Sequence, residues 1–207
     1  MAAVPPFPRS LAGIPVPQDD VSAFVWSWVH RSLPRWLRAH SVRAYLWAAA
    51  IGEREGLAPD RRVLWAASLL HDLGLTRLGR NTMCFEVEGA EIARRLLERH
   101  GMGAAAADRA AIAIILHMQP GVTIADGAEA LLLDRSTGLD VRGAEYELVD
   151  AVRDDVMRAF PREAFDRRFL AAIRREATAR PACQSARLLN ETDLAGWMAR
   201  SPWATRG

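Results

Sequence analysis

The chain has 207 residues, which suits one domain with short tails, and half of its residues are hydrophobic. Its formal net charge is +2, and its basic residues, all arginine, form no continuous run, which argues against a nucleic-acid partner. No apolar stretch is long enough to cross a bilayer, and two cysteines, Cys84 and Cys183, provide no disulfide framework. We therefore expect a soluble cytoplasmic protein that takes a small-molecule substrate, and leave a homo-oligomer open.

The predicted elements begin with a proline-rich extended arm over residues 1–19. From residue 20 onward the apolar residues follow helical spacing, and no segment shows the alternation typical of a strand. A single all-α domain is predicted over residues 20–200, with a tail at 201–207. Helices are expected at about 20–30, 35–55, 60–74, 86–99, 104–118, 124–136, 142–159, 161–179 and 184–199.

The most informative feature is the dipeptide His71-Asp72, which follows the apolar end of a predicted helix. Burying an imidazole and a carboxylate at such a place costs free energy unless a partner satisfies both groups. A divalent metal ion is such a partner, because imidazole nitrogen and carboxylate oxygen both suit Zn, Mn or Fe(II). A solvated helix end is the alternative that the dipeptide alone leaves open.

Three further polar residues stand in or at the ends of apolar helical stretches: His40, His117 and Asp134. Each alone fits a core histidine or a surface acid. Together with His71-Asp72 they predict four helices that converge on one metal, as in helical-bundle metal proteins. Arg43 and Trp47 share the helix face of His40 by their i+3 and i+7 spacing, which leaves Arg43 as either an anion ligand or a structural ion-pair partner.

The order His, His-Asp and distal Asp resembles the HD-domain superfamily of metal-dependent hydrolases, and more closely its cyanamide hydratase-like branch. The similarity covers about residues 10–185. The strings that carry it are His40-Ser41-Val42-Arg43-Ala44-Tyr45, Leu70-His71-Asp72-Leu73-Gly74, Thr82-Met83-Cys84-Phe85-Glu86 with Gly89, Leu116-His117, Leu133-Asp134, Phe160-Pro161-Arg162 and the segment 169–176.

The resemblance implies an HD-domain helical bundle of about eight to nine helices. It implies the metal ligands His40, His71, Asp72 and Asp134, and a substrate side formed by His117, Glu86 and Arg43. Where dinuclear members carry a further histidine, this chain has Phe85. The resemblance therefore implies one divalent metal, with Zn favoured and Fe(II) or Mn as alternatives.

The implied function is a metal-dependent hydratase (a hydro-lyase) or hydrolase that activates water for attack on a small nitrile- or cyanamide-like substrate. Ala39, Cys84 and the segment 135–138 depart from the branch's pattern, which puts the substrate in doubt more than the metal. Two alternatives remain. One is a phosphohydrolase of nucleotides or phosphomonoesters, which would use basic side chains from Arg43, Arg77, Arg80 and Arg135. The other is a non-catalytic small-molecule-binding domain.

The last metal ligand is open between Asp134 and Asp140. Asp134 ends the apolar run 131–133, whereas Asp140 follows Gly138 in an expected loop. We therefore favour Asp134. Cys84 carries no base partner in the sequence, so a nucleophilic role for it is not expected.

Overall fold

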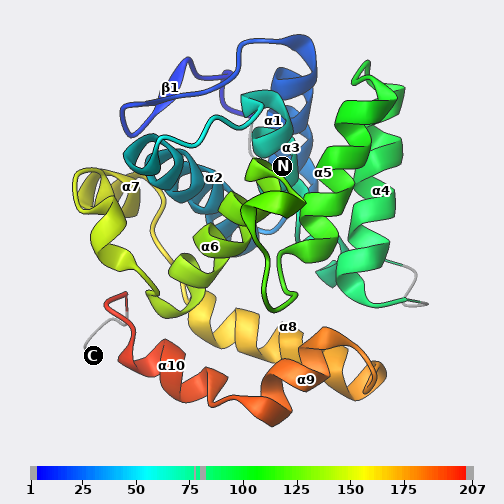
Figure 1. The fold of residues 1–207 in the computed structure, drawn as a ribbon, viewed down its shortest axis with the longest axis vertical. Helices are drawn as coiled ribbons and strands as arrows, with labels where there is room; N and C mark the ends of the chain where they lie inside the picture. The colour runs from blue at the N-terminus through cyan, green and yellow to red at the C-terminus, as the bar shows by residue number, and fades with distance from the viewer. Residues whose placement is uncertain (1–3, 77, 80–82, 204–207) are drawn as a thin grey trace.

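The computed structural model describes residues 4–76, 78–79 and 83–203, and within these ranges ten α-helices form the domain (Figure 1). The all-α prediction is confirmed, with slightly more helices than the eight or nine expected. The only strands in the described chain are the two-residue pair β1 (Ser10–Leu11) and β2 (Ile14–Pro15), within the predicted arm. Parts of this arm and of the 201–207 tail lie outside the described residues.

The first three helices begin and end where the sequence supplies caps. The Asp19 carboxylate accepts the Ser22 N–H at the start of α1 (Asp20–Ser32), and Asp60 does the same for the first turn of α3 (Arg61–Leu70). Gly56 ends α2 (Arg35–Glu55) in the left-handed conformation that favours glycine. Both α2 and α3 are buried along most of their length, so they form the centre of the core.

The next three helices enclose this centre. Helix α4 (Phe85–Arg99) follows the short 3-10 turn η1 (Leu73–Leu75) and packs against α5 (Ala104–Leu116). Helix α6 (Ala128–Arg142), preceded by the turn η2 (Ile124–Asp126), packs on α2 and α5. The predicted sixth helix, 124–136, is thus shifted, and the region around Asp140 that we expected to be a loop is helical.

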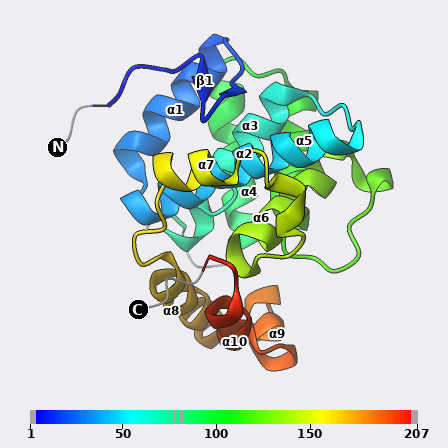
Figure 2. The same ribbon diagram turned by 90° about the vertical axis from the view of Figure 1, so that its left-hand side faces the viewer.

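The remaining helices pass from the body to a separate layer. The turn η3 (Tyr146–Val149) and α7 (Arg153–Ala159) lie beside α2, whereas α8 (Phe165–Ala179), α9 (Gln184–Glu191) and α10 (Leu194–Arg200) form a layer across one end of the body (Figures 1 and 2). A second apolar cluster joins this layer to the body through Phe85, Phe165, Phe169, Ile173, Leu194 and Met198. Within the described residues, no helix has both the length and the apolar character that crossing a membrane requires.

The two cysteines correct an expectation. Cys84, just before α4, and Cys183, just before α9, form a disulfide that ties the C-terminal layer to the body across 99 residues of sequence. Cysteine spacing alone did not indicate this, because only the fold brings these two helix starts together. With the disulfide formed, Cys84 has no thiol to act as a nucleophile. The pairing favours an oxidising environment over a reducing one.

Candidate metal centre

Three helices deliver the polar residues that the sequence analysis singled out. His40 lies within α2, His71 is the C-cap of α3 with Asp72 directly after it, and His117 is the C-cap of α5. All four are buried, each exposing 6 % or less of its surface. The turn η1, which begins directly after Asp72, packs tightly against the start of α4. A Cβ on Gly74 would overlap the Phe85 carbonyl oxygen, so only glycine fits there. This close contact fixes the position of Asp72.

The three imidazoles all turn the same nitrogen away from the centre. The Nδ1 atoms of His40, His71 and His117 lie 2.7 Å from an Asp140 oxygen, 2.8 Å from the Ser68 carbonyl and 2.5 Å from the Ile114 carbonyl. A carbonyl and an ionised carboxylate only accept, so each Nδ1 carries the hydrogen. In the neutral form, each Nε2 then presents its lone pair to the centre, which is the arrangement of metal-binding histidines.

The Nε2 atoms converge on Asp72. His40 Nε2 and His71 Nε2 are 3.1 Å apart, and they lie 3.6 and 3.3 Å from Asp72 Oδ2. That oxygen is buried without a hydrogen-bond partner, and the three residues bring their ligand atoms within 4.8 Å of one another. Two lone pairs facing each other beside a carboxylate require a positive charge between them, so the donor set fits a divalent metal.

The titration behaviour of the site points to the same need. Burial alone would lower the pKa of His71, but the Asp72 carboxylate, together with the Ser68 carbonyl and the Asp140 charge, raises that pKa overall. Burial would likewise raise the pKa of Asp72, yet the His71 charge lowers it to about 2. A proton shared between His71 and Asp72 would supply the positive charge that a bound cation would supply. Burial and the His71 charge lower the pKa of His117 to about 4, which leaves His117 neutral near pH 7.

Asp140 supports the centre from behind. Its two oxygens accept from Arg43 Nε at 2.7 Å, from Arg43 Nη2 at 2.8 Å, from Trp47 Nε1 at 2.9 Å and from His40 Nδ1. Burial would raise the pKa of Asp140, but the Arg43 charge holds it well below its usual range. With every lone pair engaged, this carboxylate orients His40 and has none left for a metal.

The sequence analysis missed this role of Asp140. The signal was present in the shared helix face of His40, Arg43 and Trp47, since all three bind the same carboxylate. Arg43 is fully buried by this contact and does not line the cavity described below. Its place in the structure is therefore that of a positioning residue.

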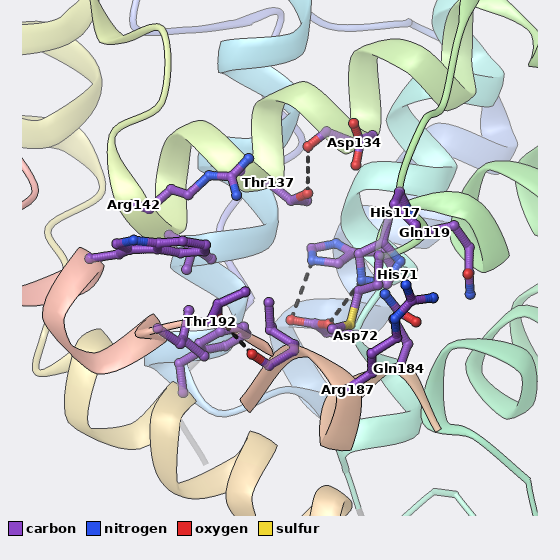
Figure 3. Close-up of a pocket in the computed structure, with 18 of the residues that line it drawn as sticks. His71, Asp72, His117, Gln119, Asp134, Thr137, Arg142, Gln184, Arg187 and Thr192 are labelled. Carbon is purple, nitrogen blue, oxygen red and sulfur yellow. Dashed lines mark hydrogen bonds and ion pairs between the residues drawn. The ribbon is translucent and has the colours of Figure 1, made fainter. Parts of the chain in front are cut away.

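Asp134 lies on the wall of the site, apart from the three-residue group. It projects from α6 beside Thr137, whose hydroxyl donates to the Asp134 backbone carbonyl at 2.9 Å (Figure 3). Burial raises the pKa of the Asp134 carboxyl to about 6. Of the two aspartates, only Asp134 lines the cavity, and its carboxylate makes no hydrogen bond to the described protein.

Glu86 is buried near the start of α4 but does not line the cavity. Burial raises the pKa of its carboxyl, and the charges closest to it belong to Glu176 and Arg180 on the C-terminal layer. We call His40, His71 and Asp72 the metal group. The residue that fills the space beside it is Phe85, whose ring lies edge-on to His117 at a centroid distance of 5.9 Å.

A cavity of about 410 Å³ opens onto this centre, a volume that suits a small ligand (Figure 3). Helix α6 and the turn after α5 form one side, and α9 and α10 form the other. The polar or charged residues that line it, besides the metal group, are His117, Gln119, Asp134, Thr137, Arg142, Gln184, Arg187, Glu191 and Thr192.

Comparison with known proteins gives one family. The model of the HD domain matches residues 37–193, which contain His40, His71, Asp72, His117, Asp134 and Asp140. No curated protein matches the chain.

Proposed function

The chain belongs to the HD-domain family, and we propose that it is a mononuclear metal-dependent hydratase or hydrolase acting on a small nitrile- or cyanamide-like compound. HD domains are in general metal-dependent hydrolases, and the buried group of His40, His71 and Asp72 could hold the ion. The observation that carries the proposal is the convergence of two imidazole Nε2 atoms on an otherwise unpartnered Asp72 oxygen.

His40, His71 and Asp72 would hold the ion, with Asp134 as the proposed fourth ligand. A divalent ion there supplies Lewis-acid activation of water and substrate. Zn suits two imidazoles and carboxylates, and Fe(II) or Mn would suit them too. We infer one ion per chain, because Phe85 stands beside His117 where a further ligand would be needed for a second.

His117 is the proposed proton acceptor of the reaction. Its Nδ1 is fixed by the Ile114 carbonyl, and its Nε2 lies 3.8 Å from Asp72 Oδ1, facing the centre. With a pKa of about 4 this nitrogen is unprotonated near neutral pH, so its lone pair is available as the acceptor of a water hydrogen. Glu86 would act only indirectly, through the residues that line the cavity, since it does not line the cavity itself.

The phosphohydrolase alternative depends on free basic side chains beside the metal group. Arg43 is neutralised by Asp140, and Arg135 is paired with Glu55 and Glu145 outside the cavity lining. Arg77 and Arg80, the other two arginines that this alternative invokes, lie outside the described residues. Of the four arginines that this alternative invokes, the two described ones are therefore not free to bind a phosphate ester at the metal.

The test combines metal content with a substrate panel. Elemental analysis of protein purified without added metal should give about one divalent ion per chain. His71→Ala should abolish binding, whereas His100→Ala, which changes a histidine at the far end of α4, should retain the ion. Hydration of cyanamide or of small nitriles is expected. Phosphate release from nucleotides without nitrile hydration would support the phosphohydrolase instead, and a protein that never retains metal would support a non-catalytic binding domain.

A further inference from the structure

Arg142 occupies an unusual place in the cavity. It is the last residue of α6, is exposed, and lines the same cavity as the metal group. In the view of Figure 3 it lies to the left of His71 and His117, with Thr137 between them. Arg142 and the metal group therefore line different parts of one cavity.

The Arg142 guanidinium has no acceptor in the described chain. Neither a hydrogen bond nor an ion pair within 4.0 Å joins it to any described residue; its Cζ lies 5.6 Å from the centroid of the Trp197 ring, and its charge acts on the Asp134 carboxylate, whose pKa it lowers against the effect of burial. Arg187, the other arginine that lines the cavity, is instead neutralised by Glu191 at 2.9 Å. Five N–H donors of Arg142 are thus available to a molecule in the cavity.

Two residues hold this guanidinium in place. The indole of Trp197, on α10, supplies a face for the cation, an arrangement that leaves the edge of the guanidinium plane for hydrogen bonds. Gly138, one turn earlier on α6, provides the space, because a Cβ there would come within 3.2 Å of Arg142 Nη2. A glycine inside a helix costs about 1 kcal/mol relative to alanine, and here it permits the close approach.

We propose that Arg142, seated on Trp197 and Gly138, is a binding subsite for an oxyanion of the substrate, apart from the group of His40, His71 and Asp72. A planar guanidinium fork with free donors suits a carboxylate or a phosphate group, which it can bind through two parallel hydrogen bonds. Apolar side chains of Val141, Phe169 and Leu188 line the cavity and would contact the carbon part of the same molecule. The inference rests on the proposed function in so far as this cavity is the substrate cavity, and it assigns the substrate a negatively charged group beyond the reacting one.

The experiment measures binding of three small probes by titration calorimetry: benzoate, phenyl phosphate and the neutral benzamide. Wild-type protein should bind at least one of the two anions, and Arg142→Met should weaken that anion at least tenfold, the size of one charge-assisted hydrogen bond, without changing benzamide. The better of the two anions identifies the oxyanion. Arg142→Lys should retain part of the affinity, and Arg187→Met, the matched control, should retain nearly all of it.

Asp72→Ala separates this subsite from the metal. Anion binding that survives Asp72→Ala but fails in Arg142→Met supports the subsite, even if metal analysis contradicts the proposed function. Anion binding that fails in Asp72→Ala and persists in Arg142→Met places the anion on the metal and overturns the inference. Equal affinity of wild type for benzoate, phenyl phosphate and benzamide, or no anion binding at all, overturns it as well.

Discussion

Asp140 accepts the Nδ1 hydrogen of His40 at 2.7 Å, a contact between residues 100 positions apart in the sequence. This bond fixes the His40 tautomer that presents Nε2 to the metal group. The same carboxylate compensates the buried charge of Arg43, so one side chain both orients a residue of the metal centre and satisfies a charge in the core. Site geometry and fold stability are therefore expected to respond together when this carboxylate is changed.

Asp140→Asn should destabilise the protein by about 3–5 kcal/mol, because Arg43 would remain buried without its counter-charge. Metal affinity should fall about 10- to 100-fold, because an amide cannot accept from His40 and Arg43 with both of its heavy atoms. Denaturant unfolding and competitive metal titration measure the two effects. Asp108→Asn, at an exposed position of α5, is the control. Wild-type stability and metal affinity in Asp140→Asn would remove the supporting role assigned here.

Gly74→Ala should destabilise the protein by about 2 kcal/mol or more and lower its metal content, because the new methyl group would overlap the Phe85 backbone. The matched control is Gly103→Ala, where a Cβ meets no atom within 4 Å and the backbone has a φ of −61°. Because Gly103 is the N-cap of α5, where alanine is less favourable than glycine, this control should stay within about 1 kcal/mol of wild type. Thermal unfolding of the two variants side by side is sufficient, and equal melting temperatures would contradict the close packing at Gly74.

Reduction of the Cys84–Cys183 disulfide should lower the free energy of unfolding by about 2–4 kcal/mol, since the bond closes a long loop in the unfolded chain. Hydrogen exchange should accelerate first in α9, which begins beside Cys183 and lines the cavity. The double variant Cys84→Ser/Cys183→Ser should behave like the reduced protein and ignore added reductant. Thiol titration of the unreduced native protein provides the check, because two reactive thiols would mean that the bond does not form.

Asp134→Asn should stabilise the metal-free protein above pH 6. The folded-state pKa of about 6 lies above the ordinary aspartate value of 3.8, so the native state holds a proton that the unfolded state releases between these values. The unfolding free energy of wild type therefore falls as pH rises through about 4–6, and the asparagine variant lacks that fall. Because the group is partly solvated, we expect a gain on the order of 1 kcal/mol at pH 7.5.

Melting temperatures at pH 4 and pH 7.5, in the presence of a chelator, test the Asp134 prediction, with Asp108→Asn as the control. A variant with the same pH profile as wild type would contradict the raised pKa. Adding Zn then tests the proposed fourth ligand. Zn should stabilise wild type more than Asp134→Asn, and equal stabilisation would leave His40, His71 and Asp72 as the only ligands from this set.

The helical class and most of the metal group were predictable from local sequence. The spacing of apolar residues is set within each helix, and polar pairs such as His71-Asp72 stand out against an apolar run wherever the helix packs. The capping residues Asp19, Asp60 and Gly56 mark helix ends for equally local reasons. These features need no knowledge of which helices are neighbours.

Tertiary structure alone decided the use of the two aspartates of α6, the pairing of Cys84 with Cys183 and the exposure of Arg142 to the cavity. Each depends on which helices meet and at what depth. The sequence predicted a loop at Asp140, whereas α6 includes this residue and packs against α2. Nothing in the sequence distinguished Arg142 from the other arginines, and its contact with Trp197 exists only because α10 packs beside α6. The sequence specifies which functional group stands at each position. The partners of that group, and hence its charge state and its role, depend on distances that only the folded chain creates.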